Sequence, residues 1–280
     1  MIRSIGSTIR WRMKPTRWAT KALLTAARAP RLATQASRRP APLGPLAAQL
    51  ETNGFVALGQ RFTAPDCDLG LVAGQAKGKA FIDVRPRFRA ETDAAAVHIL
   101  AQPDIGAMIT DYFGGNPWLW NIALNYSEPS DQLLDSQLWH FDYGDVKQLH
   151  LMAYFSDVSE DSGPFTFLPR DVSSTVPRHP LLIERMTDAT LAARHNIDVA
   201  AARTRLVGRR GEVFANDPGV LMHQGARCST TRLVLFISFT SAAPMSLGGR
   251  ATIGTADRQA LGAQYRLASP DGPIPPSAFA

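Results

Sequence analysis

The stretch SQLWHFDYGD, residues 136–145, places an imidazole and two carboxylates in a run whose other members suit a β-strand. A strand sends alternate side chains to the same face, so His140 and Asp142 are expected to project together while Phe141 points the other way. A buried imidazole and a buried carboxylate need partners. Three arrangements supply them: a hydrogen-bonded structural pair, a catalytic base with the group that orients it, or two ligands of one metal. The stretch alone leaves all three open.

Short β-rich runs follow one another through the second half of the chain, and this pattern predicts the fold. From residue 117 onward the β-rich runs, separated by turn residues, are WLWNIALNY, SQLWHFD, KQLHLMAYF, PFTFLP, GEVFAND, GVLMHQG and TRLVLFISFTS. One helical stretch, about residues 180–204, interrupts them. Short runs of this kind with little helix between them predict an antiparallel sandwich or barrel.

The first half of the chain is predicted to contain helices and a linker. The expected elements are a strand at NGFVAL (53–58), a helix capped by Thr63 that begins at Pro65, and helices over 91–101 and 103–113. The prolines of RRPAPLGP (38–45) oppose regular structure and mark the linker. We therefore expect a basic, disordered arm with its linker over 1–45, one domain over 46–250, and a C-terminal tail over 251–280.

Charge is distributed unevenly along the chain. Ten of the 30 basic residues precede Glu51, the first acidic residue, so the net charge of +6 becomes −4 once residues 1–50 are removed. The basic balance therefore gives no reason to expect nucleic-acid binding by the folded part. The arm is rich in Arg, Ala, Ser and Thr, and three interpretations stay open: a solvated tail, a mitochondrial presequence, or a surface helix that contacts anionic lipid weakly.

Three features bear on the compartment in which the protein works. No apolar run approaches the ~18 residues needed to cross a bilayer. Cys67 and Cys228 are the only cysteines, too few for a disulfide framework, which favours a reducing compartment. Arginine outnumbers lysine 25 to 5, which is typical of a GC-rich genome. We expect a cytoplasmic protein, with the mitochondrial matrix as the alternative.

A second histidine completes the pattern that His140 and Asp142 begin. His223 lies in GVLMHQGA, and strands about 80 residues apart can face the same mouth of a double-sheet jelly roll. Two imidazoles and one carboxylate can form the facial triad that holds non-haem Fe(II) and leaves positions open. Arg232 then enters the apolar strand RLVLFISF, where a guanidinium needs an anion. A salt bridge to Asp217 or the distal carboxylate of 2-oxoglutarate would meet that need.

These motifs resemble the phytanoyl-CoA dioxygenase family of Fe(II)/2-oxoglutarate oxygenases over roughly residues 50–245. The resemblance is carried by WHFDYGD, LHLMAYFSDVSEDSGPFTFLP and MHQGARCSTTRLVLFISF. It implies a mainly β fold with flanking helices, the cupin-like jelly roll called the double-stranded β-helix. It also implies iron ligands at His140, Asp142 and His223, a 2-oxoglutarate carboxylate anchor at Arg232, and co-substrate contacts at Tyr154 and Asn125. Tyr154 as a core aromatic and Asn125 as a strand-end amide stay open as alternatives.

The resemblance implies a hydroxylase in which Fe(II), 2-oxoglutarate and O2 act on a small-molecule substrate, with succinate as a product. Asp142 would fill the coordination position that a halide needs, which favours hydroxylation over halogenation. A non-catalytic jelly-roll metal-binding or scaffold protein is the alternative, and a metal-assisted hydrolase would need a base or second metal that the sequence does not show. PRDV (169–172) stands where family members often carry PGSH, so the substrate is undefined.

The remaining polar and aromatic residues near these motifs are expected to have structural roles. We expect the other four histidines to lie at the surface or in a satisfied core position: His98, His150, His179 and His195. Trp120 and Trp139 are expected in the core. Lys147 is expected at a solvent-facing strand entry, with an anionic contact near the mouth as the alternative.

Overall fold

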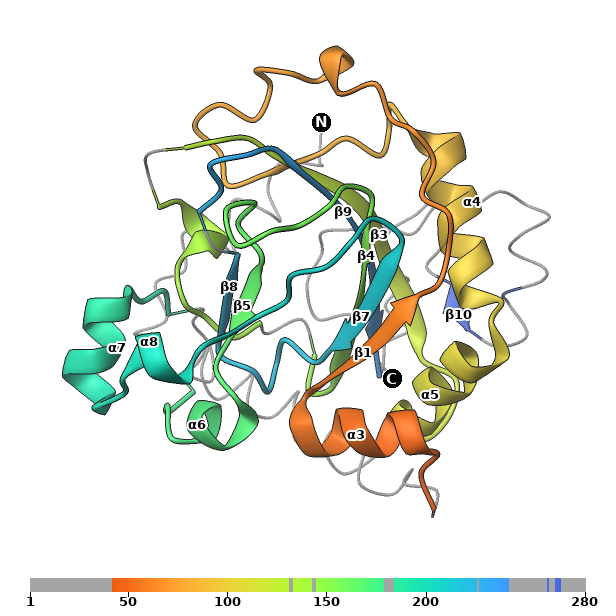
Figure 1. Cartoon of the computed structure of the whole chain (residues 1–280). Helices are drawn as coiled ribbons and strands as arrows, with labels where there is room; N and C mark the ends of the chain where they lie inside the picture. The colour runs from red at the N-terminus through yellow and green to blue at the C-terminus, as the bar shows by residue number, and fades with distance from the viewer. Residues whose placement is uncertain are drawn as a thin grey trace, which may run out of the picture.

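The computed structural model describes residues 42–130, 133–142, 145–178, 184–225, 227–241, 261 and 265–267 (Figure 1). Two sheets form its centre. The larger has the order β1 (Phe55–Gln60), β7 (Glu212–Asn216), β4 (Gln148–Tyr154), β9 (Arg232–Thr240), β3 (Trp118–Ser127) and β10 (Arg266–Leu267), with β2 (Ile82–Asp83) also beside β3. The smaller has the order β6 (Thr204–Arg205), β5 (Phe165–Phe167) and β8 (His223–Gly225). The arm, residues 1–41, and His179 lie outside the described residues.

The strand pairing is antiparallel except between β10 and β3, and it confirms the predicted mainly β jelly roll with flanking helices. Non-consecutive strands lie side by side in both sheets, as β9 does between β4 and β3. Segments far apart in the sequence therefore meet between the sheets, which is the property that a composite site requires.

Helices cover the outer face of the larger sheet. They are α3 (Pro45–Asn53), α4 (Arg89–Leu100) and α5 (Pro103–Phe113) (Figure 1). The main apolar core lies between them and the sheet, where Ile99, Ile105 and Leu235 are among its fully buried side chains. α4 and α5 confirm the predicted helices at 91–101 and 103–113. α5 ends where Gly114 adopts the left-handed conformation with φ of 68°, which a glycine tolerates without strain.

The inner face of the larger sheet points at the smaller sheet. Met152 and Tyr154 of β4 and Val234 of β9 belong to a second apolar cluster with Phe165 and Phe167 of β5. Because side chains alternate along a strand, the residues two and four positions away on β4 and β9 share this inner face. Arg232 and His150 therefore belong to it as well.

A third apolar cluster lies under the helical insertion beside the smaller sheet. The insertion contains α7 (Asp188–His195) and α8 (Val199–Ala202), and α6 (Arg170–Ser174) precedes it (Figure 1). Trp139 is fully buried there, as predicted, with Leu168 and Leu191, and its indole Nε1 donates to Asp188 Oδ1 at 2.6 Å. This cluster fixes the segment that leads into His140.

Three local predictions are wrong. No helix begins at Pro65: residues 61–68 have no regular structure and a short 3₁₀ turn, η1 (Leu69–Leu71), follows. The last residue of the expected linker, Pro45, and the first of the expected strand, Asn53, are the two ends of α3, because Pro45 at the first turn suits a helix start. SQLWHFD is not a strand of the sheet, since the 3₁₀ turn η2 (Asp135–Gln137) and single bridges from Trp139 and His140 replace a continuous ladder.

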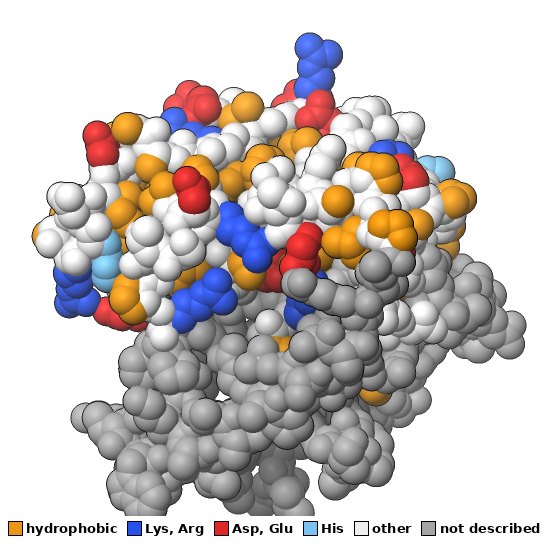
Figure 2. All heavy atoms as spheres, turned by 90° about the horizontal axis from the view of Figure 1, so that it is seen from below, with side chains coloured by type: hydrophobic (Ala, Val, Ile, Leu, Met, Phe, Trp, Pro, Cys, Tyr) orange, Lys and Arg blue, Asp and Glu red, His pale blue; other side chains and the backbone are white. Residues whose placement is uncertain are grey.

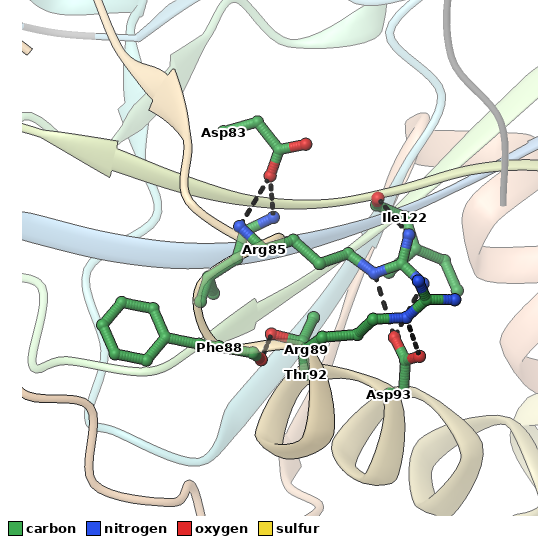
Figure 3. Close-up of polar contacts among 8 residues, drawn as sticks. Asp83, Arg85, Phe88, Arg89, Thr92, Asp93 and Ile122 are labelled. Atoms are coloured by element: carbon green, nitrogen blue, oxygen red, sulfur yellow. Dashed lines mark hydrogen bonds and ion pairs between the residues drawn. The ribbon is translucent and has the colours of Figure 1, made fainter. Parts of the chain in front are cut away.

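Polar contacts join β2 and the start of α4 to β3. Asp83 Oδ1 accepts from the backbone N–H groups of Leu124 and Arg85, both at 3.0 Å. The Arg85 guanidinium, only 6% exposed, donates to Asp93 Oδ1 through Nε and Nη2 at 2.9 and 2.7 Å, and to the Ile122 carbonyl at 3.4 Å (Figure 3). Every branch of this guanidinium has a partner, so the residue serves the fold.

Part of the expected C-terminal tail belongs to the core. Leu261 and Tyr265 are 3% and 1% exposed, and the Tyr265 ring lies 5.3 Å from that of Phe239 in β9. β10 pairs with the first residues of β3. Packing of the chain thus extends to at least Leu267, while the domain boundaries themselves stay predictions.

The described surface is mixed in character. Seen from below, Lys and Arg side chains lie beside Asp and Glu side chains and hydrophobic groups (Figure 2). None of the helices in the described part of the chain has the length and apolar character to cross a membrane.

Candidate metal centre

The predicted triad residues come together between the sheets. His140 and Asp142 lie in the extended segment that follows η2, and His223 is the first residue of β8. The backbones of His140 and His223 pair reciprocally, with N···O distances of 2.9 and 3.0 Å. Their rings consequently lie 4.4 Å apart between centroids. One ligand atom from each of His140, Asp142 and His223 lies within 4.8 Å of the other two, a spacing at which they could share one metal ion.

Both imidazoles are oriented by their own backbones. His140 Nδ1 lies 2.7 Å from the Leu138 carbonyl oxygen, and His223 Nδ1 lies 2.9 Å from that of Leu221. A carbonyl oxygen only accepts hydrogen bonds, so Nδ1 carries the proton in each ring and Nε2 keeps its lone pair. His140 Nε2 is 3.5 Å from Asp142 Oδ1. Such support through the second ring nitrogen is usual for metal-binding histidines.

The electrostatics give Asp142 and His223 the protonation states of metal ligands. Burial by itself would raise the pKa of Asp142, but the adjacent imidazoles of His140 and His223 hold that pKa well below its ordinary value. Burial, together with the neighbouring His140, lowers the pKa of His223 to about 3, against the opposing charge of Asp142. Near neutral pH the carboxylate is charged and the His223 ring is neutral, as metal coordination requires.

The donor set fits a divalent transition metal of the iron type. Two imidazole nitrogens and one carboxylate oxygen suit Fe(II), and a three-ligand set leaves coordination positions for other molecules. Tetrahedral structural zinc sites are normally closed by four protein ligands, and this group of described residues supplies three.

Arg232 lies inside the barrel without a carboxylate partner among the described residues. Its Nε is buried and has no hydrogen-bond partner, and Nη2 reaches only the Ser127 hydroxyl, at 3.4 Å. Burial lowers the pKa of Arg232, yet a guanidinium stays charged. Its Nη2 would lie 3.7 Å from a Cβ at Gly225, two residues beyond His223 on β8. A partly buried guanidinium whose Nε is buried and unpaired thus faces the strand that carries a triad residue.

The predicted alternative partner of Arg232 is wrong. Asp217 instead accepts from the Tyr112 hydroxyl at 2.6 Å and from the Gly219 N–H at 2.7 Å. Burial raises the pKa of Asp217, and these two hydrogen bonds oppose that shift. Asp217 therefore stabilises the turn after β7 and does not form an ion pair with Arg232.

Asn125 and Tyr154 share the inner face with Arg232. Asn125 of β3 pairs with Val234 of β9, and Val234 also pairs with Tyr154 of β4. The Oδ1 atom of Asn125 is buried and has no hydrogen-bond partner among the described residues. The Tyr154 hydroxyl donates to the Leu206 carbonyl, so its proton is engaged within the protein. Burial raises the pKa of Tyr154 above its ordinary range, and the nearby Arg232 opposes the shift.

Two further polar residues of this part of the chain, His150 and Lys147, have defined partners or neighbours. His150 is on the inner face of β4, where burial lowers its pKa despite the opposing charge of Asp142. It was expected at the surface or in the core, and the alternation HLMAY, which puts it on the side of Met152 and Tyr154, is the signal that could have placed it.

Lys147 is not solvent-facing: its Nζ donates to Glu51 Oε2 at 2.8 Å and lies 3.8 Å from the centroid of the Tyr112 ring.

The chain's sequence matches no family model and no curated protein. Solved structures resemble its fold. A non-heme monooxygenase, ThoJ in its apo form, is 16% identical, with 84% of this chain and 92% of that chain covered and a TM-score of 0.50. This likeness is one of fold, and it agrees with the jelly-roll topology.

Two further solved structures have TM-scores below 0.5. The epimerase SnoN, solved with Fe3+, alpha ketoglutarate and nogalamycin RO, is 16% identical over 71% of this chain and 83% of that chain, with a TM-score of 0.47. HygX from Streptomyces hygroscopicus, solved with nickel and 2-oxoglutarate, is 15% identical over 76% and 91%, with a TM-score of 0.44.

Proposed function

We propose that the protein is a non-haem Fe(II)- and 2-oxoglutarate-dependent dioxygenase that hydroxylates a small organic molecule. In this reaction 2-oxoglutarate is decarboxylated to succinate and CO2 with consumption of O2. The observation that carries the proposal is the convergence of His140, Asp142 and His223, whose ligand atoms lie within 4.8 Å of one another. The resemblance of the surrounding motifs to the phytanoyl-CoA dioxygenase family supports it.

The protein residues would supply binding and orientation. His140 and His223 would hold Fe(II) through Nε2, and Asp142 through a carboxylate oxygen. The iron, when bound, supplies the activation of O2 that side chains cannot provide. Asp142 occupies the place that a halide would need, which favours hydroxylation over halogenation. The apolar cluster between the sheets, with Met152 and Phe165 among its members, limits the access of water to this region.

Arg232 would anchor the distal carboxylate of 2-oxoglutarate. Its buried Nε has no hydrogen-bond partner among the described residues, and a guanidinium can donate two parallel hydrogen bonds to a carboxylate. The Oδ1 atom of Asn125, on the same face of the sheet, is buried without a hydrogen-bond partner and can accept a hydrogen bond. This supports a contact between Asn125 and the co-substrate. Tyr154 would form a wall of this pocket, because its hydroxyl proton is already donated to Leu206.

The proposal is tested by adding Fe(II) and 2-oxoglutarate anaerobically to the purified full chain. We expect a weak visible metal-to-ligand charge-transfer band, together with slow succinate formation once O2 is admitted. His223→Ala is the matched control and should abolish the band. A folded wild-type protein that holds Fe(II) but shows neither band nor succinate would refute the oxygenase and favour the non-catalytic metal-binding protein.

A further inference from the structure

The three triad residues are supported unequally. His140 and His223 are each held twice, through their reciprocal backbone pair and through the Nδ1 contact with a carbonyl oxygen. The Asp142 carboxylate contacts only His140 Nε2 among the described residues, at 3.5 Å. That nitrogen is the one that would turn to a metal. The direction of the Asp142 side chain then depends on how its backbone is held.

The backbone N–H and carbonyl of Asp142 are both hydrogen-bonded. Its N–H donates to the Pro218 carbonyl at 2.9 Å, and its own carbonyl accepts from Gln148 Nε2 at 2.9 Å. Gln148 is the first residue of β4 and is only 2% exposed. A buried amide at this place satisfies a loop carbonyl that a similarly sized apolar side chain would leave without a donor.

The turn that carries Pro218 is itself fixed. Asp217 receives hydrogen bonds from Tyr112 of α5 and from the Gly219 N–H, and its backbone N–H donates to the Gly54 carbonyl at 2.8 Å. Gly219 also lies against Gln148: a Cβ at Gly219 would be 2.8 Å from Gln148 Nε2. The turn and the Gln148 amide are therefore closely packed around Asp142.

We infer that Gln148 is a positioning residue for the metal centre, which holds the Asp142 backbone so that the carboxylate faces the two Nε2 atoms. The inference rests on the proposed metal site and goes beyond it by assigning a residue that contacts neither metal nor co-substrate. Partners of this kind act on metal affinity more than on folding, and losing one typically weakens binding by about 10- to 100-fold.

The test measures Ni(II) binding to the metal-free full chain by titration calorimetry, with Ni(II) as an air-stable probe. Gln148→Met keeps the length of the side chain and removes its donor, and we expect Ni(II) to bind about 10- to 100-fold more weakly. The control is Gln102→Met, because Gln102 Nε2 makes the same kind of bond, to the Arg61 carbonyl at 2.8 Å, in another part of the fold. Gln102→Met should leave Ni(II) affinity unchanged.

A second variant keeps the test decisive if Gln148→Met does not fold. Gly219→Ala keeps glutamine at position 148, but the added methyl group displaces the Gln148 amide from the Asp142 carbonyl. Ni(II) should therefore bind more weakly to this variant, as it should to Gln148→Met. The visible spectrum of the Co(II)-loaded protein should change as well, because Asp142 would be misdirected. A purely structural role would lower the melting temperature and leave affinity and spectrum unchanged.

The outcomes separate the two claims. If the wild type does not bind Ni(II) in a 1:1 ratio, the proposed metal site fails. If the wild type binds Ni(II) but the folded variants bind it equally well, the site stands and the role of Gln148 is overturned.

Discussion

Two arginines in this molecule, Arg85 buried and Arg232 partly buried with a buried Nε, have opposite surroundings. On the outer side of the larger sheet, Arg85 donates to Asp93 through Nε and Nη2 and to the Ile122 carbonyl through Nη1 (Figure 3). On the inner side, Arg232 has a buried Nε without a partner and one 3.4 Å contact with Ser127. A buried cation is costly unless an anion compensates it. The protein supplies that anion for Arg85, and the proposed function assigns a ligand carboxylate to Arg232.

If the proposed role of Arg232 is right, this difference separates a residue that stabilises the fold from one that binds a ligand. Removing the partner of Arg85 should affect unfolding and leave ligand binding alone. Removing Arg232 should affect ligand binding and leave unfolding nearly unchanged, since the apo protein gains little from a cation without an anion.

The largest effect is expected for Arg232→Leu. The variant should fold and take up Fe(II), but its affinity for 2-oxoglutarate should fall by roughly 30-fold to several thousand-fold, since losing one partner of a buried charged pair costs about 2–5 kcal/mol. Arg232→Lys should recover only part of this, because an ammonium lacks the two-pronged geometry. Melting temperature and 2-oxoglutarate affinity are measured on the same sample. Unchanged affinity with a lower melting temperature would mean that Arg232 is structural.

Asp93→Ala tests the other arginine. It removes the carboxylate that receives two donors of Arg85, whose side chain and that of Asp93 are 8% and 15% exposed. Breaking a buried pair in this way typically costs about 3 kcal/mol of the free energy of unfolding. Urea denaturation should show that loss, with 2-oxoglutarate affinity of the folded protein unchanged. A variant that lost affinity without losing stability would reverse the roles assigned to the two arginines.

The sequence predicts much of the sheet and the triad but not the support around them. β3, β4 and β9 are long apolar runs bounded by turn residues, so local pattern suffices. The segment with His140 has the composition of a strand, yet its backbone partners are Met186 and His223, which local sequence cannot reveal. α3 was missed because Gly44 offers no side-chain cap and the neighbouring prolines indicate a linker.

The supporting residues could not be predicted for a similar physical reason. The role of Gln148 depends on a hydrogen bond to a loop carbonyl six residues earlier, and that of Asp217 on Tyr112, 105 residues away. Such contacts follow from the three-dimensional turn geometry. The triad was accessible because imidazole and carboxylate are unusual in apolar strands, whereas a glutamine beside an apolar strand has many ordinary explanations.

A smaller effect is expected from pH on the metal-free protein. Burial lowers the pKa of His223 to about 3 and also lowers that of His150, while the unfolded chain keeps the ordinary value of about 6.5. The unfolded state therefore binds more protons below pH 6.5, and stability should fall as the pH drops from about 6.5 toward 3, by about 1.4 kcal/mol per pH unit for each proton.

This pH dependence is measured by urea denaturation in the presence of a chelator at pH 7 and pH 5.5. His223→Asn should reduce it. His98→Gln is the matched control, since His98 is exposed on α4 and its loss should leave the dependence unchanged. Equal stability of the wild type at the two pH values would contradict the buried, neutral state of His223.

The smallest effect is expected at Ser127, the described side chain that accepts a hydrogen bond from the Arg232 guanidinium. Ser127 is 1% exposed, and its hydroxyl accepts from Nη2 at 3.4 Å, a long contact that contributes little energy. If Arg232 is held mainly by its incoming carboxylate, Ser127→Ala should weaken 2-oxoglutarate binding by no more than about fivefold, which corresponds to about 1 kcal/mol. Calorimetry on Ser127→Ala and Arg232→Leu in parallel provides the measurement. A loss at Ser127 as large as that at Arg232 would mean that the hydroxyl binds the carboxylate directly, and that the anion site is shared between β3 and β9.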